Sequence, residues 1–472
     1  MAHRLSRRQI LGVGLTAAGA AAATPFLTRA ASAGTAAPLA PGAVQATLTK
    51  AIPTLPWAAA NDIVAATKLP MFPDATFDVT KYGAKGDGTT DDTAAFAKAI
   101  TACNAAGGGH VVVPSGTYLT GAIYLKSNVD LHLNSGATLK FSGTASRYPT
   151  VLTRYEAIEC MNRSPMIYAY GETNIALTGS GTLDAAATKS WNTGSDRAYL
   201  ESLIAKGVTD PHKRVVPGSG HHLRSTFVEP YNCDTVLIQG VTLRNSQFWQ
   251  IHPTLCRNVT VDGVTTRASF KNTDGCDPEC SDHVLIVNSD LGGNDDNIAI
   301  KSGRDADGRR VNTPSQNIVI VNNTMKGPWG AVTCGSEQTG GIRNVYAYKC
   351  VATGTRYALF IKSNTRRGGF TQNINLDSFV GHGQQLAFAF AQMNYMGQTG
   401  NFPPQFGNWN ITNCTADHTP YAFKMTGLGS DHIKGLTVRD CTFTNIGNAD
   451  LLSNVDGVSF TNVTLNGKPD NH

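Results

Sequence analysis

A polar turn followed by a short apolar alternation recurs through the second half of the chain. The pattern is visible in "CDTVLIQGVTLRNS", "CRNVTVDGVTTRAS" and "SQNIVIVNNTMKG", and six further segments repeat it. The first apolar residues of the nine segments are Val236, Val259, Val284, Ile318, Val345, Ile374, Trp409, Leu436 and Val458, at spacings of 23, 25, 34, 27, 29, 35, 27 and 22 residues. Short strands repeated in this way predict a parallel β-solenoid, because one coil cannot bury its apolar face alone.

The composition agrees with a turn-rich all-β protein. Glycine accounts for 48 of the 472 residues and charged residues for only 15%, while the 41% hydrophobic content is ample for a core. The formal net charge of +5 is modest for this length, and it fits either a polyanionic ligand or an ordinary solvated surface. We expect no nucleic-acid partner and no membrane partner.

The first 33 residues have the layout of a cleaved export signal, with a basic start, an apolar run and the small-residue end Ala31-Ser32-Ala33. Arg7 and Arg8 followed by "QIL" resemble a twin-arginine signal, which serves proteins exported already folded; an ordinary secretion signal is the alternative. Residues 34–58 are Pro/Ala-rich and predict a linker. Residues 59–472 are then a single domain that works in the periplasm or outside the cell.

Ten cysteines follow the signal. An exported location permits disulfides whose connectivity the sequence does not give, whereas folding before export favours buried thiols.

The segment "FDVTKYGAKGDGTTDDTAAFAKAI" predicts a short strand, a glycine turn and an amphipathic helix with Asp91 or Asp92 at its N-cap. Such a helix would cover the open end of the first coil. The segment resembles the opening of carbohydrate-active right-handed β-helices, which include lyases, hydrolases and phage tailspikes. We therefore expect a right-handed parallel β-helix with a short N-terminal capping helix.

Two adjacent aspartates, Asp295 and Asp296, precede an apolar strand in "GNDDNIAIKSG", and Asp274 lies 21 residues earlier, about one coil. Trp329 follows Asp296 by 33 residues and Lys362 follows Trp329 by 33, so these positions are expected on successive rungs of one face. Converging carboxylates raise at least one pKa and give a protonated acid beside an ionised base. An inverting glycosidase places that pair about 6.5–9.5 Å apart. A calcium site and a turn ladder are the alternatives.

Several unusual motifs occur in one order: "SPMIYAYGETNIALTGSGTLD", "NSQFWQIHP", "NTDGCDPE", "DDNIAIKSG", "CGSEQTGG" and "IKSNTRRGG". From about residue 77 to residue 467 the chain resembles glycoside hydrolase family 28, the polygalacturonases. The resemblance implies hydrolysis of galacturonosyl linkages in pectin with inversion, without a metal or other cofactor. It implies Asp295 as general acid, and Asp274 and Asp296 as the residues that hold and deprotonate the attacking water.

Further residues are carried over from the same resemblance. Lys362 matches a lysine that binds a substrate carboxylate, and Tyr395 in "QMNYMG" resembles a substrate-contacting tyrosine. Glu337 in "GSEQTGG" and Arg367 in "TRRGG" resemble the exo-acting bacterial branch, which removes units from chain ends.

The sequence departs from the family pattern at Trp329, where Pro-Trp-Gly replaces Gly-His-Gly, and at Phe360, where Phe-Ile-Lys replaces Arg-Ile-Lys; an Asn is also inserted before the Asp pair. We expect both aromatic residues to face the cleft and to bind a sugar face in place of a second carboxylate clamp. This favours a rhamnogalacturonan-directed galacturonohydrolase as an alternative to a plain polygalacturonase. A polysaccharide lyase and a non-catalytic polysaccharide-binding protein are further alternatives, and we expect a monomer.

Overall fold

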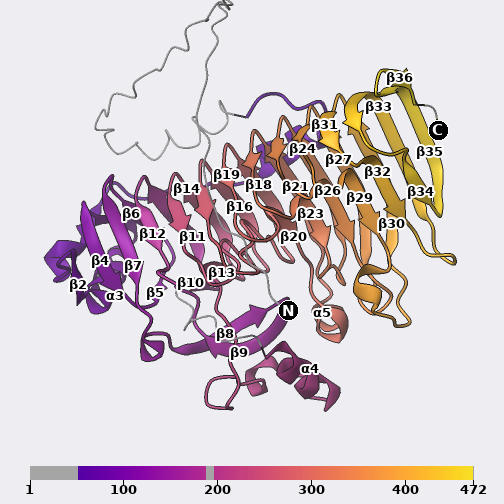
Figure 1. Cartoon of the computed structure of the whole chain (residues 1–472). Coiled ribbons are helices and arrows are strands. Elements are labelled where there is room, and N and C mark those ends of the chain that lie inside the picture. Colours follow the sequence, from indigo (N-terminus) through magenta and orange to yellow (C-terminus); the bar gives the residue numbers. More distant parts are fainter. Residues whose placement is uncertain (1–51, 188–195, 471) are drawn as a thin grey trace, which may run out of the picture. The chain divides into compact units, whose positions relative to one another are not determined.

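Parallel strands stacked coil upon coil make up most of the computed structural model, which describes residues 52–187, 196–470 and 472 (Figure 1). The expected export signal, and the expected linker as far as residue 51, lie outside the described residues. Three stacks of strands run through the solenoid.

The first stack consists of β1 (Thr76–Asp78), β3 (Gly109–Val113), β6 (Val129–Leu133), β11 (Thr173–Gly179), β14 (Asp234–Gln239), β16 (Arg257–Asp262), β18 (Asp282–Val287), β21 (Ser315–Val321), β24 (Ile342–Tyr348), β27 (Phe370–Asp377), β30 (Gln405–Thr412), β33 (Ile433–Ile446) and β35 (Val455–Leu465). The second stack consists of β2 (Asp87–Asp91), β4 (Gly116–Thr120), β7 (Ala137–Phe141), β12 (Thr182–Asp184), β15 (Thr242–Arg244), β17 (Thr265–Arg267), β19 (Asp290–Leu291), β22 (Thr324–Met325), β25 (Val351–Thr353), β28 (Val380–His382) and β31 (Thr415–Thr419), which pairs with the end of β33. A short β36 (Lys468–Pro469) pairs antiparallel with β35.

The third stack consists of β5 (Ile123–Tyr124), β10 (Ile167–Tyr170), β13 (Val228–Tyr231), β20 (Ile298–Ile300), β23 (Gly330–Gly335), β26 (Tyr357–Lys362), β29 (Ala387–Gln392), β32 (Tyr421–Thr426) and β34 (Leu451–Ser453). Single bridges at Ile251 and Cys276 connect β13 to β20, so this stack is continuous.

The observed registers confirm the solenoid. Each of the nine repeat residues pairs with the next one along the chain, from Val236 with Val259 to Leu436 with Val458. Their side chains point inward and lie in one continuous apolar core. Because parallel crossovers are right-handed, the fold is the predicted right-handed parallel β-helix.

Asparagines form a ladder near the start of successive first-stack strands. Asn317, Asn344 and Asn373 all adopt the left-handed conformation, with φ of 57°, 57° and 55°. Asparagine tolerates this conformation better than most residues. Each amide also donates to the one on the coil before, at 2.9 Å for Asn344 to Asn317 and for Asn373 to Asn344. The Asn-rich turns in the sequence are therefore stacked hydrogen-bonding positions.

The predicted capping helix is α3 (Thr93–Ala105), which follows the short turn η1 (Val79–Tyr82) and inserts Phe96 and Ile100 into the core at the end of the solenoid (Figure 1). Asp92 is its N-cap residue, but the Asp92 carboxylate accepts from the backbone N–H of Lys85 (2.7 Å) and Gly86 (3.2 Å) instead of capping the helix.

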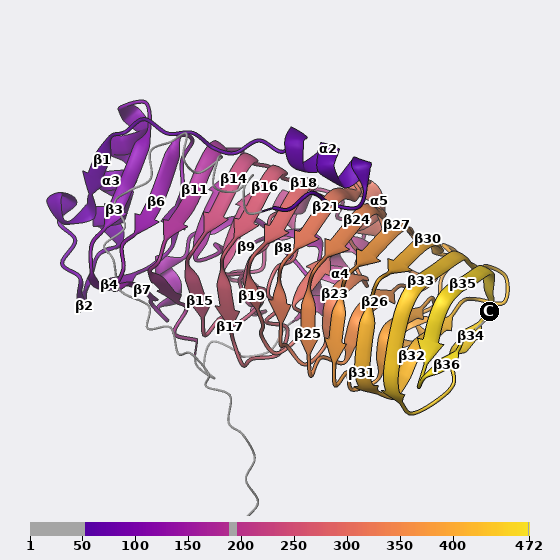
Figure 2. The same ribbon diagram turned by 90° about the horizontal axis from the view of Figure 1, so that it is seen from above.

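An N-terminal segment that precedes the first coil, called the strap here (residues 52–72), lies along the outer face of the first stack. Its helix α2 (Ala58–Ala66) crosses over β18 and β21 (Figure 2). Leu55 and Ile63 are buried there, and the Trp57 ring lies 5.4 Å from that of Tyr346. Residues 52–58, expected as the end of a linker, therefore pack on the solenoid.

A hairpin and two helices project beside the third stack. The hairpin pairs β8 (Thr150–Tyr155) with β9 (Ile158–Arg163), and the helices are α4 (Arg197–Ala205) and α5 (Asp305–Val311) (Figure 1). Single turns η2 (Ala145–Arg147), η3 (Pro211–Lys213) and η4 (Tyr395–Gly397) complete the elements.

All ten cysteines are buried and free. None of the described helices is long and apolar enough to cross a membrane.

Candidate active site

Asp274, Asp295 and Asp296 converge at the start of β20, each offering a carboxylate oxygen within 4.8 Å of the others. The backbone N–H of Gly275 donates to the carbonyl of Asp296 at 3.0 Å, which fixes two adjacent coils in register at this point. Asp274 and Asp296 are buried, whereas Asp295 is partly exposed. The Asn272 amide donates to Asp295 Oδ2 at 3.3 Å.

The carboxylate oxygens are closer than the expected separation of 6.5–9.5 Å between acid and base. A water hydrogen-bonded at about 2.8 Å to each of two oxygens spans up to about 5.6 Å between them. The observed spacing therefore has room for one water that bridges two carboxylates.

Burial, and then the neighbouring Asp296 charge, raise the pKa of Asp295 to about 6. Burial raises the pKa of Asp274 well above its usual value, and the charges of Asp277 and Asp295 raise it further. Asp296, in contrast, has a cation and a backbone donor on its two oxygens. Its Oδ2 forms an ion pair with Lys362 Nζ at 2.8 Å, and its Oδ1 accepts from the Gly330 N–H at 2.8 Å. The cluster thus combines a readily protonated carboxyl group with a carboxylate held by a cation.

The sequence analysis missed Lys301 and Asp277, which lie within the quoted motifs. Lys301 Nζ lies 3.6 Å from Asp274, 3.4 Å from Asp277 and 3.6 Å from Glu337. Burial raises the pKa of Asp277 to about 7, although Lys301 opposes the shift. The side-chain alternation along β20 could have predicted the position of Lys301. Ile298 and Ile300 point into the core, so Lys301 points outward.

The three aspartates could also hold a cation. Lys362 on Asp296 and Lys301 beside Asp274 already supply positive charge to them, which disfavours a metal ion there.

The expectation that Phe360 faces the cleft is wrong. Phe360 is 1% exposed, because the Lys362 ammonium lies 4.4 Å from its ring centroid and the Tyr357 ring lies 4.2 Å away. Tyr395 flanks the same lysine at 5.3 Å. The Phe360 ring therefore packs against the Lys362 ammonium, and it is too buried for a sugar to stack on it.

The expected register of Trp329 and Lys362 is also wrong. Strand β26 pairs with β23 so that Gly330 opposes Tyr357 and Gly335 opposes Lys362, an offset of 27 residues where 33 was assumed. Trp329 is half-buried, and the Arg356 guanidinium lies 4.8 Å above its ring. Sequence reasoning overlooked Arg356, which has no ion-pair partner in the described part of the chain.

A buried charged cluster closes the side of the site beyond the carboxyl ends of β20, β23 and β26. Glu337 accepts from Arg304 Nη1 at 3.4 Å and Arg367 Nη2 at 3.3 Å, in addition to its contact with Lys301. Burial disfavours the charge on Glu337, but these three cations together hold its pKa well below its usual value. Both predicted exo-type residues, Glu337 and Arg367, therefore belong to this closing cluster.

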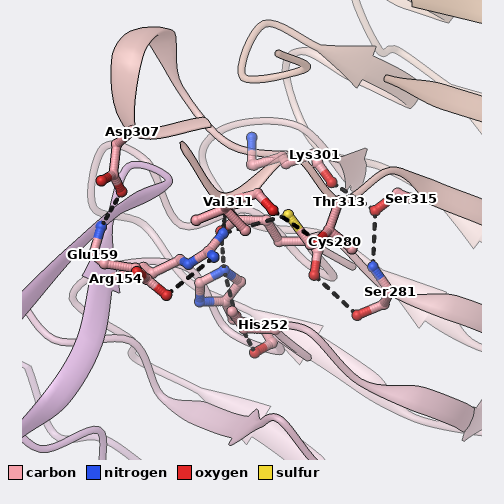
Figure 3. A network of polar contacts seen from close by, with 12 residues as sticks. Arg154, Glu159, His252, Cys280, Ser281, Lys301, Asp307, Val311, Thr313 and Ser315 are labelled. Atoms are coloured by element: carbon pink, nitrogen blue, oxygen red, sulfur yellow. Dashed lines mark hydrogen bonds and ion pairs between the residues drawn. The ribbon is translucent and has the colours of Figure 1, made fainter. Parts of the chain in front are cut away.

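The hairpin covers the part of the third stack that lies on the N-terminal side of the aspartates. Arg154 forms an ion pair with Glu279, and Thr153 Oγ1 donates to Glu229 at 2.7 Å. Figure 3 shows Arg154 beside His252, and its Nη1 donates to Cys280 Sγ at 3.4 Å. Because Arg154 is fully buried in this network, the hairpin is fixed over the strands that precede the aspartates.

The comparisons with known proteins agree with this geometry. The model of glycosyl hydrolases family 28 matches residues 103–380. A crystal structure of an exopolygalacturonase from Thermotoga maritima is 35% identical, with a TM-score of 0.84 over 87% of this chain and 96% of that one. An exo-poly-alpha-D-galacturonosidase from Dickeya chrysanthemi is 26% identical over 83% of this chain and 74% of the relative. A probable polygalacturonase from Vitis vinifera is 27% identical over 76% and 72%.

With a family match over more than half of the chain, and with the fold and the aspartate cluster in place, the chain belongs to glycosyl hydrolases family 28.

Proposed function

We propose that this protein is an exo-acting hydrolase that removes galacturonosyl units from the ends of pectic chains. The observation that carries the proposal is the aspartate cluster, in which Asp295 has a pKa of about 6 beside the Lys362-paired Asp296. Such a pair of carboxyl groups in different protonation states is what glycosidic cleavage requires.

In the proposed mechanism Asp295 donates its proton to the glycosidic oxygen of the leaving chain. A water bridging Asp274 and Asp296 attacks the anomeric carbon from the opposite side, and Asp296 accepts the water proton. The C–O bond to the leaving chain breaks as the new C–O bond forms, so the configuration inverts. Asp295 is then reprotonated from solvent, to which it is partly exposed.

The closed surroundings support exo action. The cluster of Glu337, Arg304 and Arg367 blocks one side, and the hairpin covers the coils before Asp274. A chain end fits such a site, whereas the interior of a polymer requires a cleft open on both sides. The named exo-acting relatives support the same mode.

Positive charge near the aspartates supports a uronate substrate. Lys362 forms an ion pair with Asp296. Arg356, which has no ion-pair partner among the described residues, stacks on Trp329, the neighbour of the Gly330 whose N–H binds Asp296, and guanidinium groups suit carboxylates. The Arg356 guanidinium offers a positive charge that Phe360, which stands where the family has an arginine, cannot supply. Rhamnogalacturonan oligomers remain the second candidate, because Trp329 is half-exposed and a sugar face could lie against it.

The test is product analysis on polygalacturonate and on rhamnogalacturonan oligomers, with Asp295→Asn protein as control. We expect monogalacturonate as the sole early product, with new reducing ends and without ultraviolet absorbance. Absorbing products would identify a lyase, mixed oligomers an endo-enzyme, and binding without turnover a non-catalytic protein. Faster cleavage of rhamnogalacturonan would favour the second candidate.

Three accompanying points belong to the proposal. Residues 1–33 direct export to the periplasm or the medium, the enzyme works as a monomer, and it uses neither metal nor cofactor. Sedimentation velocity of the mature protein tests the monomer.

A further inference from the structure

A second group of potential metal ligands lies at the C-terminal end of the solenoid, apart from the aspartate cluster. Asp450, Asp470 and His472 each offer a ligand atom, and these atoms lie within 4.8 Å of one another. Asp450 directly precedes β34, which is five strands beyond β20 in the third stack. Paired strands are about 4.8 Å apart, so roughly 24 Å along the solenoid separates this group from the aspartate cluster.

Two separate segments of the C-terminal coil supply these side chains. Asp450 is held at the start of β34, where its Oδ1 accepts from the Phe423 N–H of β32 at 3.0 Å. Asp470 directly follows β36, which pairs antiparallel with β35 (Figure 1). The His472 ring packs 4.9 Å from the Phe460 ring of β35. A ligand shared by the three side chains would therefore tie the start of β34 to the segment that follows β36.

The carboxylates of Asp450 and Asp470 lack the partners that buried charges need. The Asp450 side chain is 1% exposed and the Asp470 side chain 15%, and the Oδ2 atom of each has no hydrogen-bond partner. No lysine or arginine of residues 52–187 and 196–470 forms an ion pair with either of them. The catalytic aspartates, in contrast, have Lys362 and Lys301 beside them. Two buried carboxylates in contact are costly unless a cation lies between them.

The spacing and the ligand types suit a transition-metal ion. His472 Nε2 lies 3.4 Å from Asp470 Oδ1 and 4.0 Å from Asp450 Oδ2. Tetrahedral ligands at about 2.1 Å from Zn²⁺ are roughly 3.4 Å apart, so only small movements of these side chains are needed. Imidazole nitrogen together with carboxylate oxygen suits Zn²⁺ and similar ions, whereas Ca²⁺ takes oxygen ligands.

We infer that Asp450, Asp470 and His472 bind one divalent transition-metal ion, for which Zn²⁺ is the natural candidate, and that this ion closes the C-terminal coil. The ion has a structural role and takes no part in hydrolysis at the aspartate cluster. The inference is therefore independent of the proposed function, and turnover at moderate temperature does not require the ion.

The first test is calorimetry with zinc chloride on chelator-treated protein at pH 7. The wild type should bind one Zn²⁺ at this site, and His472→Ala and Asp450→Asn should each weaken binding at least about tenfold, since loss of even an outer-shell partner typically costs about 10–100-fold. Asparagine at position 450 can still accept from the Phe423 N–H, and His472 is exposed, so both variants should fold. His432→Ala is the matched control, because His432 contacts only one carboxylate, that of Asp456 at 2.8 Å, and should bind like the wild type.

Three results would overturn the inference. These are absence of zinc binding by the wild type, equal affinity in the wild type and both ligand variants, and loss of binding in Asp295→Asn protein, which would place the ion at the catalytic cluster instead.

Hydrogen exchange tests the structural role of the ion. With free Zn²⁺ at about 100 times its Kd, amides of β34 and β36 that exchange through an opening that releases the ion should exchange about 100-fold more slowly. Amides of β20 should not change, and His472→Ala should abolish the effect. Unchanged exchange in β34 and β36 of the zinc-bound wild type would refute the closure of the coil.

Discussion

Asp295→Asn tests the acid–base assignment because it should lower turnover and, at pH 7, raise thermal stability. Asparagine keeps the shape, and its one amide oxygen can still accept from the Asp296 N–H, but its NH2 group replaces the oxygen that accepts from Asn272 and it cannot deliver a proton. With a pKa of about 6, Asp295 is about nine-tenths protonated at pH 5 and about one-tenth at pH 7. Wild-type activity should therefore fall about tenfold per pH unit above pH ~6.

Turnover should drop 10²–10⁴-fold in the variant, a loss of ~2.7–5.4 kcal/mol of transition-state stabilisation. Stability should change in the other direction. The folded-state pKa is raised from 3.8 to about 6, so ionisation of Asp295 destabilises the fold as pH rises, by at most ~3 kcal/mol above pH 6. The uncharged variant escapes this cost and should unfold at higher temperature than wild type at pH 7, but not at pH 4.

The assay pairs pH–rate profiles with thermal unfolding at the two pH values. Asp74→Asn is the control, since Asp74 is exposed and its side chain makes no hydrogen bond or ion pair with the described residues, so neither readout should change. A folded Asp295→Asn protein with wild-type turnover would refute the acid assignment. A variant no more stable than wild type at pH 7 would refute the electrostatic reasoning.

Three other predictions address the rest of the site. Lys301→Met removes the cation shared by three buried carboxylates and should destabilise the fold by ~3–5 kcal/mol at pH 7. The loss should be smaller at pH 5, because Asp277, with a pKa of about 7, is then protonated. Denaturant unfolding at both pH values measures the difference. Activity should persist in chelator, and a loss that calcium restores would contradict the proposed metal-free mechanism. Proton NMR of the first product should show the inverted β-anomer of galacturonate, whereas an α-anomer would point to a covalent intermediate on one of the aspartates.

The repeat could be read from the sequence because inward side chains of stacked coils alternate and recur at the same place in each coil. The same regularity brought Asp274 close to Asp295. The prediction was wrong where motif spacing was taken for coil length, as from Trp329 to Lys362, because the coil from β23 to β26 is 27 residues long and Lys362 reaches Asp296 with its long side chain instead.

The walls of the site lie outside the repeat and could not be predicted from it. The hairpin β8–β9 and the segment 196–225 have no periodicity that fixes where they pack, and their position depends on single long-range contacts. Arg154 and Glu279, for example, are 125 residues apart in sequence. No local sequence signal places the hairpin over the third stack.

The strap gives the solenoid a property that a plain stack lacks. Coils that contact only their neighbours can unzip from either end, one after another. The strap, however, packs against Ala176, Leu237, Leu285, Val319 and Tyr346, which come from five different strands of the first stack. Opening any one of those coils first requires release of the strap, so the middle of the solenoid should melt as one cooperative block around the aspartates, while the C-terminal coils fray independently.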